Sequence, residues 1–478
     1  MASSLDSQPT RFDRKFLRWW LVVCAVVGAA LCLSQLLEIR ARSALRGYDN
    51  TFNYLWLRSA MVDGDWDFRN DLELCDTLGP EYRASALSLP LTAAGRIPNK
   101  YGIGWSLLTL PFYVLADGLV SAGRGLNLWS YQNDGFNPVY QVCVQLGHAG
   151  LALLALWMAT VSITRWLGSG RARPSRKAQE RLGGSTEDFV RSPGNIPVAA
   201  IFGVISVWAA SPLIYYQTAN VSMSHGAAFF AVSLLAYALS RNRIETSRYG
   251  WWGLAGAAMG LAVIVRYQLV IFALPVGWQL FKLRRERWKL LAASLCFLGG
   301  VTPFIALQLF AWRSVYGEWL VFSYGAEGES FHWLKPEILN SLVSPWHGTF
   351  YWHPYLLVAL SGMLAWAWKQ RGEAATWSVC VGLMLYVNAA WWCWWFASSF
   401  GNRGYDAALL PMMAGAAWMM QHLERRGRVI LWITAMTLGL WNFYVVLLYR
   451  TGAISRSQSV TWHEMIQAVT RLGEAAKF

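Results

Sequence analysis

The chain has 478 residues, of which 55% are apolar and 14% are charged, and its mean hydropathy is +0.30. A soluble core of this size cannot bury so much apolar surface, so the composition excludes an ordinary soluble protein and indicates an integral membrane protein. The formal net charge of +14 does not indicate nucleic-acid binding, because the basic residues form short clusters between apolar runs, where they act as topology signals that face anionic lipid.

The first predicted membrane-spanning helix covers residues 17–37, which is long enough to cross a hydrocarbon core of about 30 Å. Basic side chains lie at its start: Arg11, Arg14, Lys15 and Arg18. The positive-inside rule therefore places residues 1–16 in the cytoplasm. A cleaved signal peptide is the alternative, but the apolar run is longer than a typical signal core and no clear small-x-small cleavage site follows it. We expect a retained helix.

Residues 38–137 form the predicted first outer loop, which contains an apolar stretch at 101–120. The next convincing span is 139–166, and the segment 165–191 that follows is the most basic part of the chain. If 101–120 crossed the membrane, this basic segment would face outside, against the positive-inside rule. We therefore expect 101–120 to be a juxtamembrane helix in the membrane interface.

The same alternation of apolar runs and basic clusters predicts the remaining spans. They cover residues 196–216 and 223–239, a pair of short helices within 250–281, and residues 290–310, 349–368, 377–396, 407–420 and 429–448. Basic clusters flank both ends of 250–281, so this stretch must cross an even number of times, as two helices of about 24 Å that turn at Arg266. The predicted fold is an all-α polytopic membrane domain, residues 17–449, with about eleven spans, a second large outer loop at 311–348 and an outer tail at 450–478.

Distant parts of the chain place ionisable side chains at the same outer surface: Asp49, Lys100, Arg266 and Arg403. A charged group at this depth is costly unless it faces water, a partner or a ligand. A carboxylate near several cations fits a reaction on an anionic lipid phosphate. The alternatives are a helix N-cap for Asp49 and, for Lys100, a side chain that snorkels at the start of the interfacial helix.

Four further outer-side residues are candidates for contacts with an acceptor or a metal. Asp63 and Asp65 form an Asp-x-Asp pattern, which is a weak metal signal in a Gly-containing stretch where a turn is the default. Single histidines such as His225 and His347 more often have a structural role than bind a metal. No paired histidine spacing supports a zinc site. The seven cysteines form no metal or disulfide pattern. The Asp-x-Asp pattern leaves a divalent cation as a candidate cofactor, and no other cofactor is expected.

Several short motifs resemble those of bacterial GT-C glycosyltransferases, in particular the aminoarabinose-transferase-like and protein-O-mannosyltransferase-like branches. The motifs are Tyr48-Asp49-Asn50 with Asp63-Gly64-Asp65, Lys100-Tyr101-Gly102-Ile103-Gly104, Ser344-Pro345-Trp346-His347-Gly348-Thr349-Phe350 and Ser399-Phe400-Gly401-Asn402-Arg403. In that family an Asp, commonly followed by Glu, acts at the acceptor in the first outer loop. Asp49 matches this Asp, whereas Asn50 departs from the Glu. Lys100 matches a basic position associated with the donor phosphate, without the prolines that commonly follow it.

The resemblance implies a transferase of the bacterial inner membrane that uses a polyprenyl-phosphate sugar at the outer face. Asp49 would act as general base on an acceptor hydroxyl, while Lys100, Arg266 and Arg403 would neutralise the departing phosphate. The expected partners are the lipid-linked sugar, membrane lipids and a lipid, glycan or protein acceptor. A flippase or transporter for lipid-linked sugars is the first alternative and predicts tolerance of Asp49→Asn. A non-catalytic protein that binds a polyprenyl lipid is the second, favoured by Asn50.

Overall fold

The helical fold expected from the sequence is present throughout the part of the chain that the structure describes. The computed structural model describes residues 11–41, 45, 47–75, 80–168, 198–242 and 248–470. These residues form helices and connecting segments, with a single isolated β-bridge between Phe331 and Trp391. The prediction of an all-α fold is confirmed. Most of the basic segment 165–191, most of residues 1–16 and the end of the tail at 450–478 lie outside the described residues.

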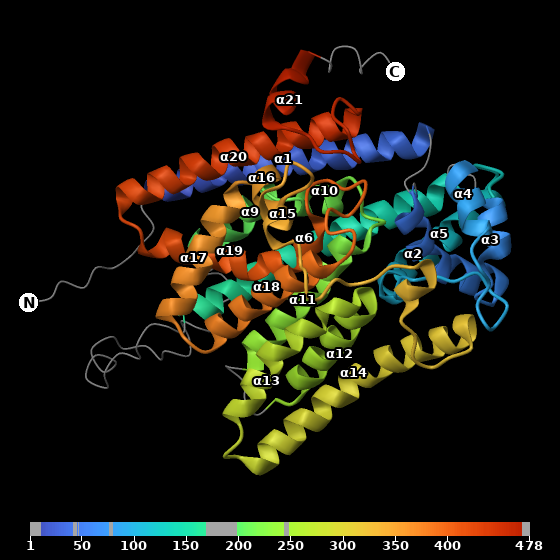
Figure 1. Ribbon diagram of the computed structural model, residues 1–478, viewed down its shortest axis with the longest axis horizontal. Helices are drawn as coiled ribbons and strands as arrows, with labels where there is room; N and C mark the ends of the chain where they lie inside the picture. Colours follow the sequence, from blue (N-terminus) through green and yellow to red (C-terminus); the bar gives the residue numbers. More distant parts are fainter. Residues whose placement is uncertain are drawn as a thin grey trace, which may run out of the picture.

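The helices follow the predicted apolar runs closely (Figure 1). The long helices are α1 (Arg11–Ala41), α5 (Gly104–Gly125), α6 (Pro138–Gly168), α14 (Arg287–Tyr316) and α20 (Arg425–Thr451). Among the described residues, these five are long and apolar enough to cross a membrane. The other helices of the body are α11 (Ser224–Asn242), α12 (Gly250–Val265), α13 (Ala273–Lys282), α17 (Tyr355–Lys369), α18 (Glu373–Ala390) and α19 (Leu409–His422). The interfacial position expected for 101–120, which becomes α5, stays a prediction.

Two predicted spans contain breaks in their helices, and a third stretch breaks where the sequence predicted a turn. Residues 196–216 form α9 (Val198–Ala209) and α10 (Leu213–Thr218), which are separated by a short turn. Residues 349–368 form α16 (Thr349–Trp352) and then α17, since the intervening Pro354 cannot continue a helix begun before it. The stretch 250–281 ends its first helix at Arg266, whose backbone is extended, and resumes through a 3₁₀ turn, Tyr267–Phe272, before α13. The predicted turn at Arg266 is therefore confirmed.

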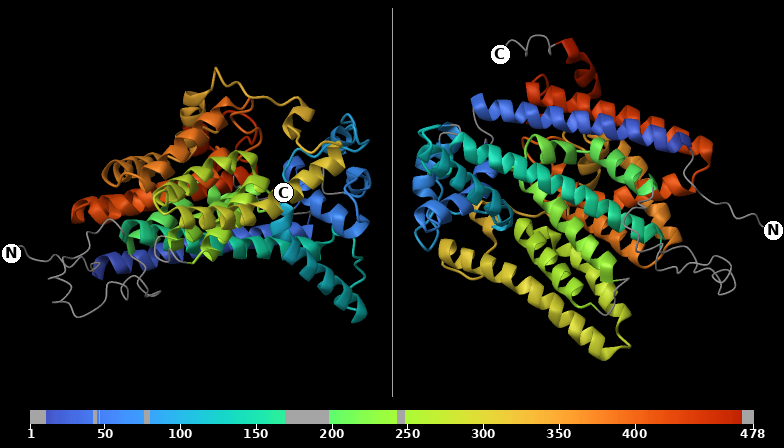
Figure 2. Two further views of the ribbon diagram at one scale, coloured as in Figure 1. Left: turned by 90° about the horizontal axis from the view of Figure 1, so that it is seen from below. Right: turned by 180° about the vertical axis from the view of Figure 1, so that it is seen from behind.

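Short helices from the first outer loop gather at one end of the long helices, as the views agree (Figures 1 and 2). They are α2 (Tyr48–Arg58), α3 (Phe68–Leu74) and α4 (Pro80–Leu87). A separate apolar cluster fixes them against the end of α14, with Phe52, Trp56, Phe68, Ile97 and Trp312 among its buried members. The second outer loop contains one short helix, α15 (Ile338–Val343), and the tail contains another, α21 (Trp462–Gln467).

Glycines allow two close backbone contacts that shape the functional end. A Cβ atom on Gly102 would lie 2.1 Å from the carbonyl oxygen of Ile264, and one on Gly104 would lie 2.5 Å from the amide nitrogen of Val265. Only glycine tolerates this approach without a shift of the backbone. The contact places the start of α5 beside the end of α12, and thereby brings the residues before Gly102 next to Arg266.

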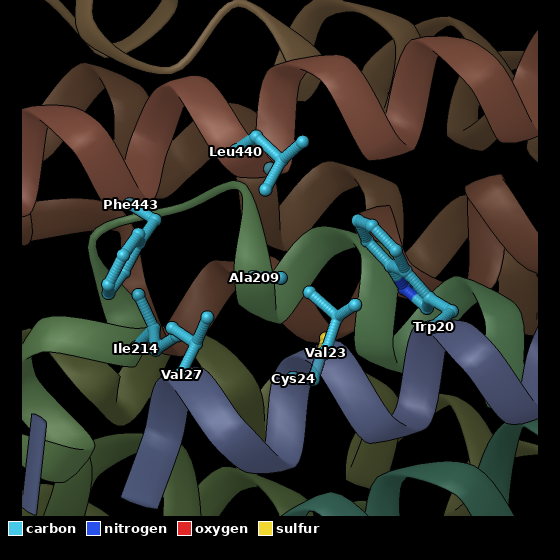
Figure 3. Close-up of a pocket in the computed structure, with 9 residues that line it drawn as sticks. Trp20, Val23, Cys24, Val27, Ala209, Ile214, Leu440 and Phe443 are labelled. Carbon is cyan, nitrogen blue, oxygen red and sulfur yellow. The ribbon is translucent and has the colours of Figure 1, made fainter. Parts of the chain in front are cut away.

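Helices α1 and α20 lie side by side at one edge of the molecule (Figures 1 and 2). An apolar crevice between them is lined by side chains such as Trp20 and Val27 of α1 and Phe443 of α20 (Figure 3). Its cavity volume is about 10 Å³, which is about the size of one water molecule. This crevice is too small for a sugar or a lipid head group.

Small residues also let α12 and α14 pack closely, as is common between helices in membranes. A Cβ atom on Gly300 would lie 2.1 Å from the carbonyl oxygen of Gly253, whereas one on Gly299 would have no atom within 4 Å. We expect Gly300→Ala to destabilise the fold by about 1–3 kcal/mol through overpacking. Gly299→Ala is the matched control and should leave the melting temperature unchanged or slightly higher. Equal melting temperatures of the two variants in detergent would contradict this packing.

Candidate functional site

Asp49 lies in the first turn of α2 and is held by groups from two distant segments. Its Oδ2 atom forms an ion pair with Nη2 of Arg403 at 2.9 Å, and the hydroxyl of Tyr101 donates to its Oδ1 atom at 2.5 Å. Gly47 occupies the N-cap position of α2, without a side-chain cap bond. The N-cap alternative for Asp49 is therefore wrong. The side chain of Asp49 keeps 29% of its surface exposed, so a substrate hydroxyl can reach it.

The surrounding charges keep Asp49 ionised at neutral pH. Burial by itself raises the pKa of this carboxyl, but the charge of Arg403, the hydrogen bond from Tyr101 and the charges of Lys100 and Arg266 together bring the pKa below its ordinary value. Opposite charges and hydrogen bonds favour the ionised form of an acid in this way. All three cations predicted from the sequence therefore act on the same carboxylate.

Lys100 faces into the site. Its Nζ atom forms an ion pair with Oε1 of Glu329 at 2.9 Å. The same ammonium lies over the rings of Tyr48, Tyr101 and Tyr324, at 5.3, 5.6 and 6.0 Å from their centroids, which are distances at which a cation is attracted to an aromatic face. Lys100 is only 8% exposed, so it does not snorkel into solvent.

Arg266 lies where α12 ends, and its guanidinium has defined neighbours. Its Nη1 atom is 3.0 Å from both ring nitrogens of His225, at the start of α11. With its amide turned so that the oxygen faces the guanidinium, Gln268 accepts from Nη2 at 2.9 Å and from Nε at 3.1 Å. His225 is thus brought to the cationic end of the site. It contacts Arg266 there, whereas the sequence suggested acceptor or metal contacts.

Asp406 is a site residue that the sequence reasoning did not find. Its Oδ2 atom is 3.6 Å from Nδ1 of His225, and both side chains are almost fully buried, at 1% and 2% exposure. Asp406 lies in the 3₁₀ turn Arg403–Ala408, three residues after Arg403. The side chains of Arg403 and Asp406 therefore come from the same short turn. An acid three residues after a candidate cation was the available signal.

The remaining candidates lie in local structure. Asp63 forms an ion pair with Arg58, whose Nη1 atom also pairs with Asp71 at 2.9 Å. Asp65 accepts from the hydroxyl of Ser59 at 3.2 Å and from the backbone of Asp67 at 2.9 Å, which are turn contacts. Burial raises the pKa of Asp71 to about 6. In the part of the chain that the structure describes, no group of three or more His, Cys, Asp or Glu side chains could hold a metal ion.

His347 is fully buried within the segment before α16. Its Nδ1 atom is 2.8 Å from the carbonyl oxygen of Trp395, and its ring lies edge-on to Trp352. Burial lowers its pKa to about 4, so it is neutral at physiological pH. These contacts join the second outer loop to the turn that carries Arg403. His347 thus makes structural contacts, whereas the sequence suggested acceptor or metal contacts.

Asn50, which follows Asp49 in α2, joins two elements of the site. Its side-chain amide donates to Oδ1 of Asn220 at 2.8 Å. Asn220 lies in the segment between α10 and α11, four residues before Ser224, where the helix that carries His225 begins. The amide therefore ties α2 to the start of α11.

Comparisons with known proteins show similarity at the level of structure. No protein-family model matches the chain, and no curated protein is significantly similar to it. One similar structure is the crystal structure of ArnT from Cupriavidus metallidurans bound to undecaprenyl phosphate. Its sequence is 15% identical to this chain and the TM-score is 0.48, and the alignment covers 96% of this chain and 70% of the ArnT chain. ArnT in the apo state is 13% identical, with a TM-score of 0.49, over 96% and 73%. These two matches assign no activity to this chain.

The Asp49–Arg403 pair can be tested by a double-mutant cycle. Asp49→Asn and Arg403→Gln should each lower the free energy of unfolding, and the double variant should lose less than the sum, with a coupling of about 1–2 kcal/mol. Because the pKa of Asp49 is lowered, the coupling should be constant above pH 5 and disappear as the pH falls through the lowered value. Thermal unfolding in detergent measures this. The exposed pair Glu286–Lys289 is the control, and strictly additive losses at Asp49 and Arg403 would exclude the interaction.

Proposed function

We propose that the protein is a membrane glycosyltransferase that moves a sugar from a polyprenyl-phosphate donor to an envelope acceptor at the outer face of the bacterial inner membrane. One observation carries this proposal: a half-buried, ionised carboxylate, Asp49, is acted on by the cations Arg403, Lys100 and Arg266. A transferase of this kind needs a base for the acceptor and positive charge for the departing phosphate. The motif resemblance to GT-C enzymes points to the same chemistry.

The reaction is a single displacement at the anomeric carbon. The acceptor hydroxyl oxygen forms the new bond to this carbon, and its proton passes to Asp49. The bond between the anomeric carbon and the phosphate oxygen breaks, and its electron pair stays on the lipid phosphate. A displacement in one step inverts the configuration of the sugar.

Competition for Arg403 links donor binding to base strength. In the structure Arg403 is paired with Asp49, which keeps the carboxylate a weak base. A lipid phosphate that engages the guanidinium takes over part of this pairing, since Arg binds phosphate with two parallel hydrogen bonds. The pKa of Asp49 then rises toward its ordinary value, and the base becomes stronger when the donor is present.

Lys100 and Arg266 complete the cationic side of the site. Lys100 is neutralised by Glu329 from the second outer loop. A donor phosphate that binds this ammonium therefore takes the place of the Glu329 carboxylate as its counter-ion. Arg266 keeps a fixed orientation through its neighbours His225 and Gln268. Preorganised cations of this kind stabilise charge that develops on a leaving group. A divalent cation is compatible with this mechanism, and no step is assigned to it.

The transfer activity is tested by mass spectrometry of envelope glycolipids and glycoproteins, with and without the gene and with Asp49→Asn. Loss of the base should reduce transfer at least a hundredfold, and the Asn variant should reproduce the glycan inventory of the null strain. The exposed Glu73→Gln change in α3 is the matched control and should retain full transfer.

Two outcomes would overturn the assignment. An unchanged glycan inventory in the null strain, under conditions where the protein is made, would exclude the transferase. Full transfer by a folded Asp49→Asn variant would exclude Asp49 as the base and would favour lipid binding or transport.

A further inference from the structure

A cavity lies where the ends of three helices meet the start of a fourth. Its walls include Trp166 of α6, Trp278 and Lys282 of α13, Trp366 of α17 and Arg371 of the turn before α18. The cavity volume is about 160 Å³, whereas a single water molecule needs about 10–15 Å³. This cavity can therefore hold a small polar group, and the proposed mechanism does not use it.

The cavity lies one helix length from the candidate functional site. Glu373, the first residue of α18, lines the cavity. Near the other end of α18, the amide of Asn388 donates at 2.9 Å to the carbonyl oxygen of Gly404, in the turn that carries Arg403. The 18 residues of α18 span about 27 Å at 1.5 Å per residue, which is close to the thickness of a hydrocarbon core. We therefore expect the cavity and the site to lie at opposite membrane surfaces.

Positive charge prevails in the cavity lining. Among the described residues that line it, Lys282 and Arg371 are the cations and Glu373 is the carboxylate, whose Oε1 atom accepts from Nε2 of Gln279 at 3.2 Å. Two cations against one carboxylate leave the lining positive whether or not Glu373 is ionised. The cavity also faces the start of α18, where the N-cap Gly372 provides no side-chain cap bond, and helix starts attract anions. The lining therefore favours an anionic ligand.

Tryptophan rings form much of the remaining wall. The rings of Trp166 and Trp366 stack with their centroids 5.8 Å apart, and the indole N–H of Trp366 donates to Oε1 of Gln370 at 3.2 Å. The Nζ atom of Lys282 lies 5.5 Å from the centroid of the Trp278 ring, a distance at which a cation is attracted to an aromatic face. Tryptophans at helix ends are typical of the membrane interface, where lipid head groups lie.

Helices α13 and α17, which both line the cavity, expose apolar faces beside it. Leu274 and Phe281 are exposed on α13, and Leu357, Leu364 and Trp368 are exposed on α17. Successive members of each set are four or seven residues apart, so each set lies on one face of its helix. An acyl chain can lie against these faces while its head group occupies the cavity, whereas a soluble phosphate gains nothing from them.

We propose that this cavity binds the phosphate head group of an anionic phospholipid, in the leaflet away from the candidate functional site, through Lys282 and Arg371. The bound lipid joins the end of α13 to the turn between α17 and α18. Basic pockets between helices on the cytoplasmic side of membrane proteins bind anionic head groups in this way, and the basic flanks of these helices predict that side here. The proposal is independent of the proposed function.

Native mass spectrometry of the delipidated full-length protein in detergent tests the proposal. It compares the affinity for dioleoylphosphatidylglycerol, dioleoylphosphatidylcholine and inorganic phosphate. The wild type should bind phosphatidylglycerol most tightly, because it alone combines acyl chains with a net negative charge. The double variant Lys282→Gln/Arg371→Gln should bind it at least about tenfold more weakly, since each basic residue near the membrane surface attracts anionic lipid.

The double variant Arg285→Gln/Lys369→Gln is the matched control. It also removes one lysine and one arginine from the ends of α13 and α17, and both residues are exposed and lie outside the cavity lining. It should keep the wild-type affinity. Equal losses in the two double variants, or no loss in the first, would overturn the proposal. Phosphatidylcholine or inorganic phosphate bound as tightly as phosphatidylglycerol would also overturn it.

Cross-linking to the wild type provides a second test that does not depend on the folding of a variant. A phosphatidylglycerol with a photoreactive diazirine near the start of an acyl chain should label α13 or α17 near Phe281 or Trp368. Labelling confined to other helices would overturn the proposal.

Discussion

The ion pair between Asp49 and Arg403 is the contact on which the site depends. It joins residues 354 positions apart in the chain, one in the first outer loop and one in the turn before α19. Tyr101, from the segment that precedes α5, holds the other carboxylate oxygen. Two segments that are distant from α2 in sequence are thus fixed to its half-buried acid. Their cations, Lys100 and Arg403, gather around it because opposite charges are stabilised where water is scarce.

Backbone packing makes this gathering possible. The contact of Gly102 and Gly104 with the end of α12 brings Lys100 and Arg266 to the same end of the molecule. The apolar cluster that includes Trp56, Phe68 and Trp312 anchors the outer-loop helices on α14. The packing of these helices and segments therefore positions the charged groups of the site.

Much of this arrangement could be predicted from the sequence. Apolar runs and basic flanks predicted the helices and the turn at Arg266, because both follow from how helices meet a bilayer. The cost of charges at membrane depth identified Asp49, Lys100, Arg266 and Arg403. Asp406 was missed, because its importance comes from burial beside His225, which only the folded chain determines. The turn contacts of Asp65 likewise depend on local backbone geometry.

A structure of the protein with a bound polyprenyl phosphate, determined by cryo-electron microscopy in lipid nanodiscs, would show whether the arginines of the site hold the phosphate. We expect the phosphate oxygens to lie within hydrogen-bond distance of the guanidinium nitrogens of Arg266 and Arg403, and the distance between Asp49 and Arg403 to increase from its present 2.9 Å. A lipid phosphate bound away from both arginines, with the Asp49–Arg403 pair unchanged, would contradict this expectation.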